Sequence, residues 1–177
     1  MSRIDAHRNR ARILASAAKK LRANPAATLE QIIAGTGLGR TTVYRHFPTR
    51  ADLVEAVAVH LIDVASGLLD QARPDEGPFR AAFARMTDTA VDVGTGMWGL
   101  LSQAGQDTIA SSRPAARIEA AVRALLQRGV DEGDLRADVP LDWHVEAYFA
   151  LAGAVVRLGD GDARVLREVF LNGLSAR

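Results

Sequence analysis

The segment Thr28–Arg50, TLEQIIAGTGLGRTTVYRHFPTR, constrains the fold more than any other part of the chain. Thr28 and Gln31 have the spacing of a capping box, which predicts the start of a short helix. Gly37 is free to adopt the left-handed backbone that ends a helix. A second short helix is predicted over Arg40–Phe47, where a proline follows and stops it. Two short helices joined by a tight glycine-containing turn describe a helix-turn-helix.

The second of these helices is mostly polar. Only Val43 and Phe47 are expected to face a core, which we expect them to share with Ile32, Leu38 and Leu53. The other side chains are mainly hydrogen-bond donors, which suit the major groove of DNA. They are Arg40, Thr41, Thr42, Tyr44, Arg45 and His46.

Charge is distributed unevenly along the chain. Residues 1–50 contain ten Lys or Arg against two acids, a net charge of +8, and residues 51–177 contain twelve against nineteen, a net of −7; the two sum to the overall +1. A basic segment joined to an acidic one favours a polyanionic partner for the first. A solvated basic face is the alternative interpretation of this pattern alone.

Composition excludes several classes of protein. The absence of cysteine excludes disulfides, zinc–thiolate sites and cysteine nucleophiles. No apolar run approaches the length of a membrane span, and no apolar signal segment follows the charged N-terminus, so we expect a cytoplasmic protein without membrane association. We find no glycine-rich phosphate loop, HExxH, G-x-S-x-G or paired acidic constellation, and therefore predict no enzyme activity, no cofactor and no metal.

The periodicity predicts an all-α chain of about nine helices, with no strands. The first covers about 5–22, and the fourth about 49–72. A fifth is predicted over about 79–93, followed by a break at Gly94–Gly99 and a short sixth helix over about 98–106. The last three are expected at about 111–129, 138–158 and 163–174.

The last two predicted helices are unusually apolar, because large apolar residues cover about half the circumference of the first of them. Helices this apolar need burial on two sides. We therefore predict a homodimer with a four-helix interface, the alternative being two ordinary core helices. The expected interface residues are Val145, Phe149, Ala152, Val156, Leu166, Phe170 and Leu174.

Residues 28–53 resemble the DNA-binding region of TetR-type transcriptional regulators. The matching features are the capped first helix, the turn Thr36–Gly39, the sequence Tyr44-Arg-His-Phe47 and the following Pro-Thr-Arg. Two positions depart from the family pattern. Gly39 replaces the usual serine cap, and Thr36 replaces a small alanine, and both departures bear on phosphate contacts.

The resemblance implies a ligand-responsive regulator, by the family's commoner mode a repressor, that binds a palindromic double-stranded DNA operator as a homodimer. It also implies a helix-turn-helix domain over residues 1–48, and a helical regulatory and dimerisation domain over 49–177 that binds an unknown small-molecule effector. The alternative is an all-helical small-molecule-binding or interaction protein without specific DNA binding.

The DNA-binding roles follow from side-chain chemistry. Arg40, Thr41, Thr42 and Arg45 are the candidates for base edges. Tyr44 and His46 are assigned to phosphates, as are Thr28 and Arg50 at helix starts. The arm from Arg3 to Arg12 is either a DNA contact or a disordered basic tail.

The effector pocket is predicted from aromatic and methionine side chains that lie near polar ones, a mixture typical of ligand sites. The alternative is that these side chains belong to an ordinary core. The candidates are Phe83, Met86, Met97, Trp98, Gln103, Trp143 and Tyr148.

Overall fold

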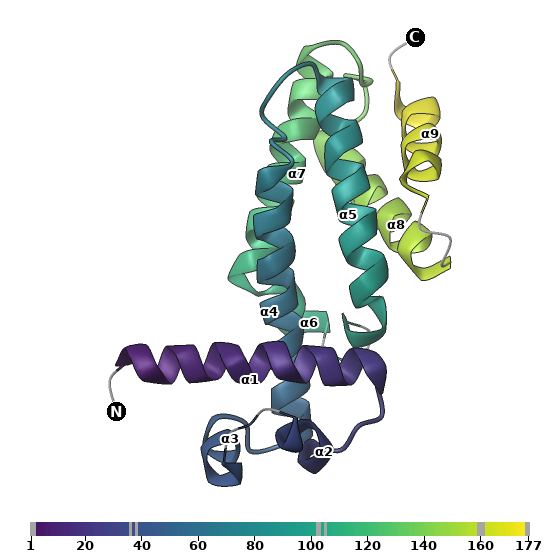
Figure 1. Ribbon diagram of the computed structural model, residues 1–177. Coiled ribbons are helices and arrows are strands. Elements are labelled where there is room, and N and C mark those ends of the chain that lie inside the picture. Colours follow the sequence, from purple (N-terminus) through teal and green to yellow (C-terminus); the bar gives the residue numbers. More distant parts are fainter. Residues whose placement is uncertain are drawn as a thin grey trace. The chain divides into compact units, whose positions relative to one another are not determined.

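The computed structural model describes residues 3–35, 37, 39–101, 104, 106–158 and 162–175, and of 3–8, 96–101 and 106–107 the backbone only. These residues form helices and no strand, which confirms the all-α prediction (Figure 1). The helices are α1 (Arg3–Ala23), α2 (Leu29–Ala34), α3 (Arg40–His46), α4 (Arg50–Gln71), α5 (Phe79–Leu101), α6 (Gln106–Ala110), α7 (Arg113–Asp131), α8 (Leu141–Leu158) and α9 (Ala163–Leu174).

The chain divides into two compact units. The N-terminal unit comprises Met1–Asp63 and Gly99–Ser112, and the C-terminal unit comprises Val64–Trp98 and Arg113–Arg177. Helix α4 therefore contributes its first part to one unit and its last part to the other. None of the described helices is both long and apolar enough to cross a lipid bilayer.

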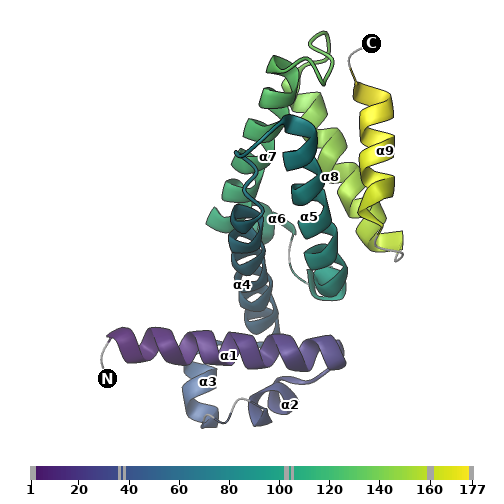
Figure 2. The same cartoon turned by 45° about the horizontal axis from the view of Figure 1, so that its top comes forward.

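The N-terminal unit packs α2 and α3 beside α1, and both views of the molecule show this arrangement (Figures 1 and 2). Its core contains side chains from all three helices and the start of α4, each at most 3% exposed: Ile13, Ala17, Leu21, Ile32, Ile33, Val43, Phe47 and Leu53. Ile32, Phe47 and Leu53 thus confirm the predicted core. The predicted core residue Leu38 lies outside the described residues.

The C-terminal unit is built around an aromatic cluster. The ring of Phe83 stacks on Phe79 at 5.3 Å between centroids and lies 5.1 Å from the ring of Phe170. Tyr148 meets both Phe83 and Phe170 edge-on, at 6.1 and 6.3 Å. These side chains come from α5, α8 and α9, so one cluster holds three helices together.

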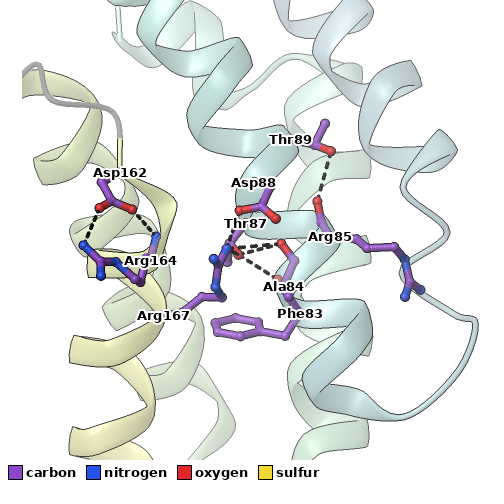
Figure 3. A network of polar contacts seen from close by, with 9 residues as sticks. All are labelled: Phe83, Ala84, Arg85, Thr87, Asp88, Thr89, Asp162, Arg164 and Arg167. Carbon is purple, nitrogen blue, oxygen red and sulfur yellow. Dashed lines mark hydrogen bonds and ion pairs between the residues drawn. The ribbon is translucent and has the colours of Figure 1, made fainter.

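A polar contact also fastens α9 to α5. Arg167 points from α9 into the side of α5, where it pairs with the carboxylate of Asp88 (Figure 3). Arg167 makes this contact through Nη1, and Nη1 also donates a hydrogen bond to Thr87 Oγ1 at 3.0 Å. Thr87 is fully buried, and its hydroxyl bonds back to the carbonyl of Phe83 at 2.8 Å.

The predicted break after residue 93 is wrong. Helix α5 continues through Gly94 to Leu101, and α6 lies at Gln106–Ala110 instead of 98–106. The glycine serves a close helix contact, because a Cβ placed on Gly94 would lie only 2.7 Å from Val156 Cγ2 of α8. A glycine in a sequence favours both a helix break and a close helix contact, and here the second applies.

Candidate DNA-binding interface

The predicted capping box at the start of α2 is confirmed. The Thr28 hydroxyl accepts a hydrogen bond from Gln31 N at 3.3 Å, and the Gln31 side-chain oxygen accepts one from Thr28 N at 2.9 Å. The hydroxyl of Thr28, a residue predicted to contact phosphate because it stands at a helix start, therefore caps the helix. Thr28 is exposed to solvent, and it stands at the N-terminus of α2, where the helix dipole has its positive end.

The turn between α2 and α3 uses glycine as predicted. Gly37 has a φ of +67°, a left-handed conformation that side chains disfavour. The preceding Gly35 carbonyl accepts a 2.7 Å hydrogen bond from Ser16 Oγ, which ties the turn to α1. Gly39 caps α3 without a side-chain hydrogen bond, as expected for a residue that has no side-chain oxygen to accept one.

Helix α3 has one buried side and one exposed side. Val43 and Phe47 are buried, which leaves the predicted base-contacting side chains Arg40, Thr41 and Arg45 exposed. Thr42, the fourth candidate, is half-buried. The helix is therefore anchored by its apolar side and presents two guanidinium groups to solvent.

Tyr44 is held in place by a residue that the sequence did not indicate. Its hydroxyl donates to Glu30 Oε1 of α2 at 3.1 Å, and this hydrogen bond raises the pKa of Tyr44. The pKa of Glu30 is lowered by a hydrogen bond from its own backbone N–H, then by Tyr44 and Thr28. The pair spans fourteen positions, a separation that no helical periodicity marks, so only the fold shows it.

Arg50, predicted to contact phosphate, donates hydrogen bonds to the protein backbone. Its Nε donates to the Ala27 carbonyl at 2.9 Å and its Nη2 to the Pro25 carbonyl at 2.6 Å. The residue is half-buried at the start of α4. The structure therefore places Arg50 as a brace between α4 and the loop that leads into α2.

His46, predicted to contact phosphate, is half-buried. Its Nε2 is buried and has no hydrogen-bond partner among the described residues.

Helix α1 contributes basic side chains beside this motif. The guanidinium of Arg10 lies 5.2 Å from the centre of the Phe47 ring, a cation–π contact that sequence periodicity could not indicate. Of the basic side chains on α1, those of Arg10, Arg12, Lys19, Lys20 and Arg22 are exposed.

The predicted pocket residues differ in their exposure to solvent. Phe83, Met86 and Tyr148 are buried in the core of the C-terminal unit, and burial raises the pKa of Tyr148. Trp143 lies on the surface with 70% of its area exposed. The side chains of Met97 and Trp98, and all of Gln103, lie outside the described residues.

The predicted dimer residues also separate into two groups. Val145, Leu166 and Phe170 are buried in the protomer's own core. Ala152, Val156 and Leu174 are half-buried, and Phe149 is exposed. The exposed apolar side chains of these helices include Leu158, Val165 and Val169, which the prediction did not name.

No group of three His, Asp or Glu side chains in the described part of the chain is arranged to hold a metal ion.

Comparison with known proteins matches the helix-turn-helix segment to a family model. The model of the bacterial regulatory proteins of the tetR family matches residues 13–57. The HTH-type transcriptional repressor LfrR of Mycolicibacterium smegmatis is 39% identical over 87 residues, which are 49% of this chain and 46% of that protein. This match thus spans less than half the length of the curated relative.

Solved structures extend the likeness to nearly the whole chain. The TetR-like regulator LfrR from Mycobacterium smegmatis in complex with proflavine has a TM-score of 0.67 and 26% identity, with 94% of each chain covered. The TetR regulator SCO0520 from Streptomyces coelicolor has a TM-score of 0.61 and 26% identity, covering 94% of this chain and 98% of that one.

An exposed basic helix in a helix-turn-helix is the arrangement of proteins that read the major groove of DNA. Residues 13–57 of the chain match the tetR family of bacterial regulatory proteins, and solved TetR-like regulators share the fold of nearly the whole chain. The matching family model and LfrR are both named as regulators of transcription.

Proposed function

We propose that this protein is a ligand-responsive transcriptional repressor that binds a palindromic operator as a homodimer. The observation that carries the proposal is the exposed side of α3, where Arg40, Thr41 and Arg45 project from a helix anchored by Val43 and Phe47. The match to the repressor LfrR supports the sign of regulation. We assign DNA binding to residues 1–48, and effector binding and dimerisation to residues 49–177.

The exposed side chains of α3 divide into two proposed roles. Arg40 and Arg45 bind guanine O6 and N7 as bidentate donors, and Thr41 and Thr42 contact thymine methyl groups. Tyr44 contacts a backbone phosphate, with Glu30 fixing the position of its hydroxyl. We also propose a phosphate contact at Thr28, which is exposed at the start of α2. His46 and Arg50 act mainly within the protein.

The test begins with selection of binding sites from random duplex DNA by the full chain. Arg45→Ala is expected to relax preference at one base position of the selected site, at a cost of about 1–3 kcal/mol. Affinity for the selected site is expected to fall steeply with salt, because bound phosphates release counterions. Fluorescence anisotropy on selected and scrambled duplexes measures both effects.

The matched control is Arg22→Ala, which removes an exposed arginine from α1 instead of α3. Its effect should be similar on selected and scrambled duplexes. Equal losses on both duplexes for Arg45→Ala would show that Arg45 only holds phosphate. Selection that yields no preferred sequence would favour the alternative, a small-molecule-binding or interaction protein without specific DNA binding.

The effector and dimer proposals rest on the C-terminal unit. LfrR, solved in complex with proflavine, supports a small-molecule effector for this chain. Among the predicted pocket residues, Phe83, Met86 and Tyr148 lie together in one core and are the candidates for the effector site.

We propose that dimers form through α8 and α9, with Phe149, Val165 and Val169 on the contact surface.

A further inference from the structure

Helix α1 carries a row of basic side chains on the face that points away from the core of the N-terminal unit. Arg12, Lys19 and Arg22 are exposed, and their spacing of seven and then three positions brings them to one side of a helix. We call these three side chains the α1 stripe. The opposite side of the helix holds the buried residues Ile13, Leu14, Ala17, Ala18 and Leu21.

The charges of the α1 stripe are not compensated within the protein. None of its three side chains has a hydrogen bond or an ion pair in the described part of the chain. Most described arginines of the C-terminal unit, by contrast, pair with a carboxylate, as Arg117 does with Asp70. Between residues 6 and 50 the sequence has a single acid, Glu30, and its carboxylate accepts a hydrogen bond from Tyr44. The stripe therefore keeps its charge for a partner outside the chain.

The length of the α1 stripe suits an extended polyanion. Arg12 and Arg22 are ten positions apart on one helix, which is about 15 Å along the axis at about 1.5 Å per residue. A single small anion therefore does not meet all three cations. A DNA duplex carries about nine phosphate charges over the same distance, and its backbone can contact every member of the stripe.

The α1 stripe and the proposed reading surface of α3 face in different directions. Both views show α2 and α3 on one side of α1, and α1 turns its buried side chains to the core that it shares with them (Figures 1 and 2). Helix α3 is anchored in the same core by Val43 and Phe47, and exposes Arg40 and Arg45 on its outer side. A straight duplex that lies along α3 therefore leaves the stripe uncovered.

We propose that the α1 stripe binds the phosphate backbone of a second DNA duplex while α3 reads the operator. The inference rests on the proposed function, because it takes α3 to be occupied by operator DNA. The contact is independent of sequence, since phosphates fix position and carry no sequence information directly. The proposed dimer has two such stripes on the outside of its reading heads, and one dimer thus joins two segments of DNA.

The test is a capture experiment with the full chain. The selected duplex is immobilised in a flow cell, protein is loaded to saturation and rinsed, and a fluorescent scrambled duplex is added at several salt concentrations. We expect capture, with a slope of log affinity against log salt of about −2.7 for three phosphate contacts. Lys19→Ala should reduce the size of this slope by about 1, and Lys19→Ala with Arg22→Ala by about 2.

Lys20→Ala is the matched control, because Lys20 is exposed beside Lys19 but lies about 100° further around the helix. It should leave the slope unchanged. Ala15 is exposed on the stripe between Arg12 and Lys19 and allows a second comparison. Ala15→Glu should weaken capture by placing a negative charge among the cations, and Ala15→Gln should not, because it adds a side chain of similar size without the charge.

Three results separate this inference from its alternatives. Capture that Lys19→Ala and Lys20→Ala lower equally would overturn it. Absence of capture, with stripe variants that instead weaken loading on duplexes with long flanks, would assign the stripe to the same duplex and would also overturn it. A chain that does not load on the selected duplex would contradict the proposed function alone, and the same variants titrated with scrambled duplex in solution then test the stripe.

Discussion

At the scale of single residues, Arg50 makes contacts in the folded chain that its position in the sequence does not indicate. Sequence chemistry assigns it to a phosphate, because it stands at a helix start in a basic segment. In the folded chain, two of its N–H groups bind the carbonyls of Pro25 and Ala27. These two hydrogen bonds tie the loop between α1 and α2 to the start of α4.

We expect Arg50→Met to destabilise the protein by about 1–3 kcal/mol, since it leaves two carbonyls without their charged donor. Urea denaturation followed by circular dichroism measures the loss. Arg45→Met is the control, because that side chain is exposed on α3 and should leave stability nearly unchanged. A variant of Arg50 that keeps full stability and loses only DNA affinity would restore the phosphate assignment.

Glu30 gives a prediction for pH at the same scale. Its pKa in the folded chain lies below the ordinary 4.5, owing to its own backbone N–H and then Tyr44. A lowered folded-state pKa stabilises the fold above pH 4.5 and loses that contribution as pH falls through the folded-state pKa. Urea midpoints between about pH 6 and about pH 3 should show this loss in the wild type.

Glu30→Gln should flatten that acid-side decline, and Tyr44→Phe should reduce it only in part, because the backbone hydrogen bond remains. Identical pH profiles for wild type and Glu30→Gln would show that the carboxylate contributes nothing to stability. The carboxylate is fully exposed to solvent, so solvent screening keeps the effect small.

At the scale of helices, local signals identified most elements. The capping box of α2, the left-handed Gly37 and the bounds of α9 all agree with the sequence, because each depends on neighbouring residues. The continuous α5 could not be predicted, since its Gly94 is explained only by Val156 on a helix distant in sequence. The contacts of Tyr44 and Arg50 escaped prediction for the same reason.

The contact between α5 and α8 predicts a sign change between two backgrounds. Gly94→Ala should cost about 1 kcal/mol in the wild type, where crowding against Val156 outweighs the gain in helix propensity. In the Val156→Ala background, the same change should stabilise by about 1 kcal/mol, because the space is then free. Thermal or urea unfolding of the four proteins measures the cycle.

Gly67→Ala in α4 serves as the control for helix propensity, because no described neighbouring atom lies within 4 Å of the added Cβ. It should be stabilising in either background. An effect of Gly94→Ala that is the same with and without Val156 would show that the two helices do not meet at this position.

At the scale of the whole molecule, the proposed dimer depends on which apolar side chains the protomer leaves exposed. Leu166 and Phe170 are fully buried within one chain, whereas 51% of Val169 is accessible. Helical periodicity identified α9 as apolar on two sides, but it could not say which side the protomer's own core would take.

We therefore expect Val169→Glu to convert dimers into folded monomers, because a buried carboxylate without a partner is strongly unfavourable in an interface. Light scattering measures the mass, and circular dichroism confirms that the helices remain. Ala81→Glu adds the same charge at an exposed position of α5 and should leave the mass unchanged. A dimer that survives Val169→Glu would place the interface elsewhere.

The fastening of α9 to α5 by Arg167 has a consequence for the order of assembly. Arg167 binds Asp88 and Thr87 within the same chain, and the helix adds Leu166 and Phe170 to a core that one chain completes. If the proposed dimer forms, we expect folding not to wait for association, in contrast to obligate dimers whose monomers have no stable fold. We therefore expect a single newly synthesised copy to retain its helical structure on dilution, before it meets a partner.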